Sequence, residues 1–116
     1  MSFGIQRNGQ TQDDDDAINQ ALRGKESGFA SLYSHHKDRV FATVSRVTCN
    51  LADTEDLVQV TFMKAFQALP RFRRQSAFST WLTRIALNVS TTHLRSKKSQ
   101  REFLDLIRRH VITDGN

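Results

Sequence analysis

The feature that most constrains the fold is the spacing of apolar residues between Asp53 and Pro70. They recur at helical intervals, and they are Val58, Phe62, Ala65, Phe66 and Leu69. This spacing places them on one face of a helix with about 3.6 residues per turn. Asp53, with Asp56 three residues later, predicts a capped start, and Pro70 cannot continue the helix. The segment therefore predicts an amphipathic helix with one face on a core.

The two preceding segments show the same period. A short helix is predicted at 13–22, where four aspartates favour the positive end of the helix dipole and Gly24 ends the helix. A second helix is predicted from Glu26 to Cys49. Its core-facing stripe comprises Phe29, Leu32, Tyr33, His36, Val40, Val44 and Val47.

The C-terminal half predicts two more helices after a basic loop at 70–77. One runs to about Lys97, capped by Ser76 or Ser79, and its inward side chains are Phe78, Trp81, Leu82, Ile85 and Val89. Ser99 and Glu102 have the spacing of a capping box, so a separate last helix is expected at 100–111. No segment alternates at period two. The predicted fold class is therefore all-α, a compact helical bundle of four to five helices.

Size and composition exclude several classes. A chain of 116 residues with 38% apolar residues fits one domain with a modest core, and residues 1–12 are polar without a period and are expected to be disordered. The single Cys49 rules out an internal disulfide, and no apolar run approaches a membrane span. No GxGxxG or phosphate-binding loop pattern is present. We expect a cytoplasmic protein that is not an enzyme and has no cofactor.

Charge is strongly asymmetric. Residues 1–70 hold 7 basic and 9 acidic side chains, a net −2, whereas residues 71–116 hold 10 basic and 3 acidic ones, a net +7. The stretch 71–101 has no acidic residue, and Phe72, Phe78 and Trp81 are interleaved with its arginines. Such a segment favours a polyanion with unpaired bases as the partner. A solvated basic face is the alternative.

The third helix has a second face, opposite its core stripe, that carries Asp56, Gln59, Val60 and Met63. We expect Val60 and Met63 to be exposed apolar groups within a polar rim, which is typical of a protein-docking surface. The alternative is that a small bundle simply leaves some apolar atoms outside.

The loop and the fourth helix form a second candidate site. One stripe of the helix carries Arg84, Asn88, Thr91 and Arg95, which can bind phosphates and base edges. In the loop, three arginines would surround Phe72 and hold a base that has left the duplex. The alternative role for Phe72 is a hydrophobic plug between helices. The three loop arginines are Arg71, Arg73 and Arg74.

Taken in order, these motifs resemble region two of bacterial sigma factors of the extracytoplasmic-function (ECF) type. The matching string and its spacing cover roughly residues 17–98. The residues that carry the resemblance are Asp53-Thr54-Glu55-Asp56-Leu57-Val58-Gln59, Phe62, Lys64, Ala65, Phe66, Phe72-Arg73, Ser76-Ala77-Phe78-Ser79-Thr80-Trp81-Leu82, Arg84-Ile85-Ala86, Asn88 and His93-Leu94-Arg95.

The resemblance implies separate binding roles for the third helix and for the loop. The third helix would dock on the clamp helices of the largest RNA polymerase subunit, through Asp56, Gln59, Val60 and Met63. The loop from Phe72 to Ala77, with Arg73, Arg74, Gln75 and Ser76, would hold a flipped base of the melted minus-ten promoter strand, with Asn88 nearby. Trp81 would belong to the core. An anti-sigma factor that covers the docking faces is a further expected partner.

The sequence departs from the family pattern at Val60, where Glu is usual, at Arg74 and Gln75, which replace a Gly-acidic pair, and at Thr92, which replaces Asp or Asn. The resemblance implies a region-two domain at 13–98 and the start of a linker at 99–116, with a possible short helix. The family's second domain, a helix-turn-helix called region four, is absent, so we expect a truncated chain.

Two other classes compete with this interpretation. A stand-alone duplex-DNA regulator of the helix-turn-helix type needs a short turn before its recognition helix, and the eight-residue loop fits that poorly. A metal or redox module needs spaced ligands, but the adjacent His35 and His36 diverge on a helix and Cys49 has no CxxC partner.

Overall fold

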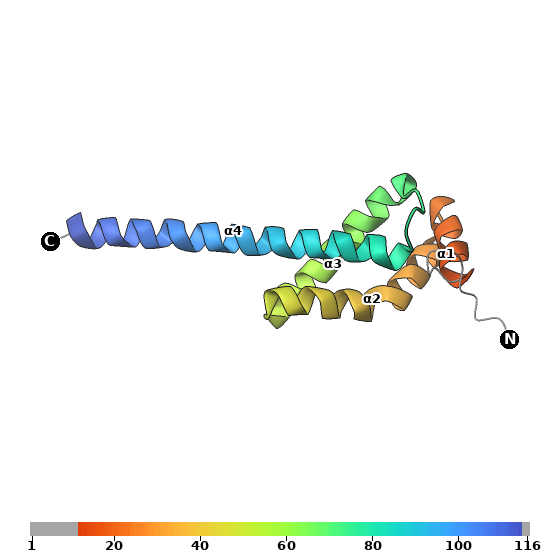
Figure 1. The fold of residues 1–116 in the computed structure, drawn as a ribbon, viewed down its shortest axis with the longest axis horizontal. Helices are drawn as coiled ribbons and strands as arrows, with labels where there is room; N and C mark the ends of the chain where they lie inside the picture. The colour runs from red at the N-terminus through yellow and green to blue at the C-terminus, as the bar shows by residue number, and fades with distance from the viewer. Residues whose placement is uncertain (1–11, 115–116) are drawn as a thin grey trace.

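The computed structural model describes residues 12–114, which form four α-helices and one short 3-10 helix, with no strand in that range. The all-α prediction is confirmed. α2 packs against each of the other three α-helices (Figure 1). In chain order the elements are α1 (Gln12–Leu22), α2 (Glu26–Thr48), α3 (Leu51–Ala68), η2 (Leu69–Arg71) and α4 (Phe78–Asp114).

α1 ends at Leu22, and Gly24 stops it as predicted, with a φ of +80° in the left-handed region that glycine adopts without strain. The Gly24 N–H donates to the Ala21 carbonyl at 2.9 Å, and the Lys25 N–H donates to the Gln20 carbonyl at 3.0 Å. This pair of bonds closes a glycine C-cap. Gln12 already belongs to α1, which corrects the expected disorder at that residue. Residues 1–11 lie outside the described range.

α1 lies directly on the backbone of α2 at Gly28. A Cβ atom placed on Gly28 would lie 2.4 Å from the Ala21 nitrogen and 2.6 Å from the Ala17 oxygen, closer than a real Cβ allows. Ile18 of α1 is fully buried. The missing side chain therefore lets α1 seat its small apolar face against α2.

The start of α3 differs from the prediction. Asn50 is the N-cap, because its side-chain oxygen accepts a hydrogen bond from the Asp53 N–H at 2.9 Å. Asp53 therefore lies inside the first turn and does not cap the helix. The predicted apolar face of α3 is confirmed, since its members are buried except Phe66, which is half-buried. They are Val58, Phe62, Ala65, Phe66 and Leu69.

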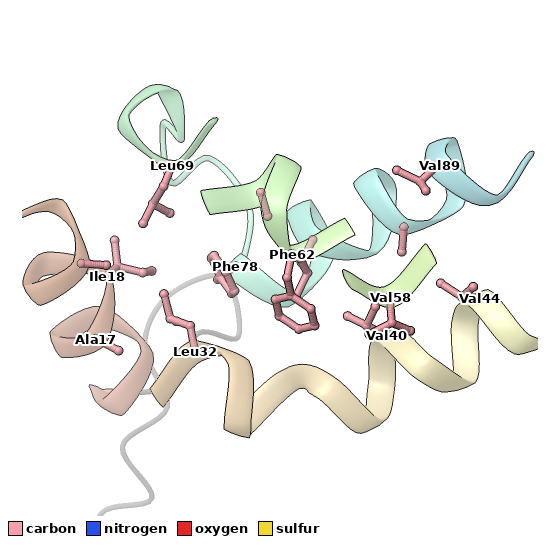
Figure 2. Packing of buried hydrophobic residues seen from close by; sticks show 14 of the residues in the cluster. Ala17, Ile18, Leu32, Val40, Val44, Val58, Phe62, Leu69, Phe78 and Val89 are labelled. Atoms are coloured by element: carbon pink, nitrogen blue, oxygen red, sulfur yellow. The ribbon is translucent and has the colours of Figure 1, made fainter. Parts of the chain in front are cut away.

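The core has Phe78 near its middle. Figure 2 shows this ring between Ile18, Leu32 and Leu69 on one side and Phe62 on the other. The first residue of α4 thus joins the end of the core formed by α1 to the part formed by α3.

α4 is one continuous helix, so the predicted separate helix at 100–111 is wrong. Glu102 lies in mid-helix and its carboxylate lies 3.9 Å from the Lys98 ammonium instead of capping a helix start. No glycine or proline interrupts α4, so helix formation propagates through Ser99. Every residue from Lys98 to Val111 is exposed, and α4 extends away from the bundle (Figure 1). Despite its length, neither α4 nor any other described helix is apolar enough to cross a membrane.

Asp53 holds the start of α3 against α4. Its carboxylate accepts a hydrogen bond from the Lys97 ammonium, and the Nε2 atom of His93 lies 3.3 Å from the same oxygen. The hydrogen bond from Lys97 lowers the pKa of Asp53 below its ordinary value of 3.8, although burial acts in the opposite direction. Lys97 directly precedes the exposed segment of α4, and its side chain contacts α3.

Gly28→Ala tests the close approach of α1 and α2. Alanine favours helix by about 1 kcal/mol over glycine, but the clash with the α1 backbone costs more, so the free energy of unfolding should fall by about 1–3 kcal/mol. Ser34→Ala, at an exposed position of α2, should change it by less than about 0.5 kcal/mol. Chemical denaturation followed by circular dichroism measures both. A stability gain in Gly28→Ala would contradict the packing.

Asp53→Asn tests the link between α3 and α4. Because the folded-state pKa of Asp53 is lowered, its stabilising contribution is present above pH 3.8 and is lost as the pH falls through the folded-state pKa. The variant should be less stable than the unsubstituted protein at pH 7, and the difference should shrink below pH 3.8. Denaturation curves at several pH values measure it. Glu55→Gln, at an exposed neighbour, should show no difference, and a constant gap for Asp53→Asn would contradict the ion pair.

Candidate nucleic-acid interface

The loop at 72–77 connects η2 to α4. Pro70 is the second residue of η2, and the Phe72 N–H donates to the Leu69 carbonyl at 3.0 Å before the chain becomes extended. Arg74 has a φ of +58°, in the left-handed region. Ala77 is buried, and its carbonyl accepts the first helical hydrogen bond of α4, from Trp81 at 3.1 Å. Ala77, predicted to touch the nucleic acid, thus holds the loop against the bundle.

A pocket of about 200 Å³ opens between this loop and the first two turns of α4. The structure brings together here six of the seven predicted loop residues and the first residue of the predicted helix stripe. Four arginines give the pocket a positive rim. Its lining comprises Arg71, Phe72, Arg73, Arg74, Gln75, Ser76, Trp81 and Arg84.

Two aromatic rings form the apolar side of the pocket. The Phe72 and Trp81 centroids lie 4.7 Å apart with 32° between the planes, and the Phe72 and Phe78 centroids lie 5.9 Å apart. Phe72 and Trp81 are half-buried and pack against the core. Phe72 thus plugs the gap between helices and also lines the pocket. Trp81 is not fully buried, which corrects its assignment to the core alone.

Arg74 turns its side chain toward α1. Its guanidinium donates a hydrogen bond to the Asn19 side-chain oxygen at 2.6 Å, and a second nitrogen lies 3.7 Å from the Asp15 carboxylate. By contrast, Arg71 and Arg73 are exposed. Sequence reasoning missed Asp15 and Asn19, and it assigned the acidic run of α1 to the helix dipole. The only signal was that an acidic run and a basic loop occur in one chain.

The predicted stripe of α4 is divided by the structure. Arg84, Asn88 and Arg95 are exposed, whereas the Thr91 hydroxyl already donates to the Leu87 carbonyl at 2.8 Å. Asn88 does not line the loop pocket. It lies one turn further along α4, in a groove shared with Val60 of α3.

The structure exposes three of the four residues on the α3 face that the sequence predicts to dock on a partner. Asp56, Gln59 and Met63 are exposed, and the Met63 side chain is 54% exposed. Val60 is half-buried and packs against the core, so its expected exposure is wrong. The reason is that α4 passes α3 on this side and places Val89 beside Val60 in the groove.

His35 and His36 of α2 lie beside the carboxylate of Asp14 in α1. Asp14 and His36 are both buried, and the His36 Nε2 atom lies 3.0 Å from each Asp14 oxygen. The His35 Nδ1 atom lies 3.8 Å from the same carboxylate. Across the described range, no three or more side chains of potential ligands are arranged to hold a metal ion.

The chain is thus an all-helical bundle with an arginine-lined loop pocket at the start of its last helix. The Sigma-70 region 2 family matches residues 32–111, and the chain belongs to this family. The resemblance drawn from the sequence motifs is therefore confirmed.

Two relatives show the extent of the similarity. The chain is 33% identical over 81 residues to the ECF RNA polymerase sigma factor SigW of Bacillus subtilis. The matched residues cover 70% of this chain and 43% of SigW. It is 38% identical over 77 residues to the ECF RNA polymerase sigma-E factor of Escherichia coli, covering 66% of this chain and 40% of the relative. The chain thus spans less than half the length of these relatives.

A solved structure supports the fold assignment. It is the NMR structure of the complex formed by an engineered region 2 of sigmaE with GTAAAA. The two folds superpose with a TM-score of 0.70 and 30% sequence identity, over 86% of this chain and 97% of that chain.

Proposed function

We propose that this chain is the part of an ECF-type sigma factor that docks on the RNA polymerase core and recognises the melted minus-ten element of a promoter. Its role is binding, and the chemistry of transcription belongs to the polymerase. The observation that carries the proposal is the pocket at the start of α4, with its arginine rim and its aromatic side formed by Phe72 and Trp81.

The pocket favours an unpaired strand. In a duplex, each base is stacked and paired, so its face cannot reach a pocket set into a protein surface. A single-stranded base can enter, lie against an aromatic ring and leave its phosphates at the rim, where Arg71, Arg73 and Arg84 are exposed. The volume of about 200 Å³ is small against the roughly 300–1,000 Å³ of pockets for drug-sized ligands, and it suits one planar ring.

The solved complex of the engineered sigmaE region supports this choice of ligand, since that protein binds GTAAAA. Arg84 and Arg95 extend the basic surface along α4 from the pocket. Asn88 lies between them and would read a base edge beside the pocket. Thr91 can only accept a hydrogen bond from the nucleic acid, because its hydroxyl proton is donated to the helix backbone.

The docking face of α3 completes the proposal. Its exposed Asp56, Gln59 and Met63 would meet the clamp helices of the largest polymerase subunit, with Val60 at the edge of the contact. An apolar side chain between polar ones is suited to a protein interface. An anti-sigma factor that covers the same face would control the protein, which would act in the cytoplasm with the polymerase.

The first test compares strands, with the chain bound to core polymerase. The complex should bind single-stranded GTAAAA more tightly than the same sequence as duplex, measured by fluorescence anisotropy. Arg84→Ala and Arg95→Ala should each reduce the log–log salt slope by about 0.7, the value for one phosphate of a single strand. Asn88→Ala should mainly relax base preference.

Arg109→Ala is the matched control, because it removes the same charge from α4 about 20 Å further along the helix. It should leave both affinity and slope unchanged. Equal affinity for single strand and duplex, together with no effect of Asn88→Ala, would contradict the proposal and favour the duplex-DNA regulator.

The second test concerns docking. Met63→Lys should leave the free energy of unfolding within about 0.5 kcal/mol, because the side chain is exposed, and should weaken binding to core polymerase at least tenfold. Leu51→Lys makes the same kind of change at a residue that is 65% exposed at the start of α3, outside the predicted face. It should bind normally in a pull-down titration. Equal loss in both variants would show that the face is assigned wrongly.

A further inference from the structure

We infer that α1 sets the shape of the base-reading loop, and that Arg74 is a positioning residue that ties this loop to α1 instead of a phosphate contact. The inference rests on the proposed function, which gives the loop its ligand. It also gives a role to the acidic run in α1, which the docking and base-reading surfaces leave unused.

The backbone at Arg74 needs an external constraint. Its φ of +58° is a conformation that glycine adopts freely and that a residue with a Cβ atom adopts at a cost. Such conformations persist only where surrounding contacts over-determine them. An arginine at this position therefore indicates that the side chain makes contacts that hold the backbone in place.

These contacts lead to α1. The hydrogen bond from Arg74 to Asn19 joins residues 55 positions apart in the chain, and the nearby Asp15 carboxylate adds an attraction over 3.7 Å. The side chains of Arg74 and Asp15 are only 36% and 24% exposed. A partly shielded pair is weakened less by salt than an exposed one. The guanidinium of Arg74 thus points toward α1, whereas Arg71 and Arg73 remain exposed on the rim.

α1 is a rigid support for these contacts with Arg74. Its backbone lies against Gly28 of α2, and its buried Asp14 is paired with His36. The His36 ring in turn lies 5.1 Å from the ring of Phe78, the first residue of α4. The loop is therefore fixed at its end through Phe78 and in its middle through Arg74.

Base selection should depend on the contacts between Arg74 and α1. Gln75 and Ser76 follow Arg74 directly and line the pocket, so their direction is set by the backbone at Arg74. If the link to α1 is lost, the loop can leave the left-handed conformation and the pocket changes shape. The phosphate-binding arginines are not removed, so the electrostatic part of binding should persist.

The experiment uses the 116-residue chain and single-stranded GTAAAA, with Asn19→Ala as the main variant. Losing the hydrogen-bond partner of Arg74 should weaken binding by roughly three- to tenfold, the range for one hydrogen bond. Preference for GTAAAA over an oligonucleotide with one base changed should fall, and the salt slope should stay unchanged. Arg74→Ala should behave alike, and the double variant should be no worse than either single one. Arg73→Ala should instead reduce the slope by about 0.7.

The matched control is Asp16→Asn, an exposed neighbour in the same acidic run, which should bind like the unsubstituted chain. A second readout needs no nucleic acid. Trp81 is the only tryptophan of the chain and lines the pocket, so Asn19→Ala and Arg74→Ala should change its emission and its quenching by acrylamide, while Asp16→Asn should not.

The outcomes separate the two proposals. An unsubstituted chain that does not prefer GTAAAA, on its own or on core polymerase, contradicts the proposed function, and the Trp81 signal still decides whether α1 shapes the loop. Normal binding and an unchanged Trp81 signal in Asn19→Ala overturn the inference. A reduced salt slope in Arg74→Ala with no effect of Asn19→Ala also overturns it, because Arg74 would then contact a phosphate.

Discussion

The arrangement of the whole molecule depends on the burial of Phe78 at the point where the loop becomes α4. The ring is fully buried and contacts the rings of His36, Phe72 and Trp81 at centroid distances of 5.1, 5.9 and 5.6 Å. Removing a buried Phe side chain costs about 3–5 kcal/mol, a large part of the stability of a typical domain. One side chain therefore fixes the direction of α4 and supports the aromatic side of the pocket.

The fold also redistributes the charge that the sequence concentrates in its C-terminal half. Arg74 faces Asp15, Lys97 faces Asp53 and Lys98 lies near Glu102. Within the bundle, the exposed arginines of the loop and of α4 then form the basic surface, and their positions follow from how α1 and α3 pack. They are Arg71, Arg73, Arg84 and Arg95.

Periodicity predicted what depends on local sequence. The apolar spacing of α3 and the glycine after α1 gave the correct helices, because helical faces and C-caps are set by residues a few positions apart. The motif string predicted the loop pocket, since six of the seven loop residues line it. The exposure of Val60 was predicted wrongly because a helical wheel does not contain the neighbouring helix, and α4 half-covers that residue. The bond between Arg74 and Asn19 spans 55 positions, beyond any local pattern.

The continuous α4 also shows what a local sequence pattern cannot predict, because a local motif here indicated a helix start that does not exist. Ser99 and Glu102 fit a capping box, but a cap forms only where the preceding residues leave the helix, and nothing in the sequence around Ser99 makes them do so. Beyond Lys97 the helix has no support from the bundle, since every residue from Lys98 to Val111 is exposed. An isolated helix of this length is marginal in water, whereas extension of an existing helix avoids the cost of nucleation. The C-terminal part of α4 therefore extends from the segment between Phe78 and Lys97, which packs on the bundle, and its helical state depends on that segment.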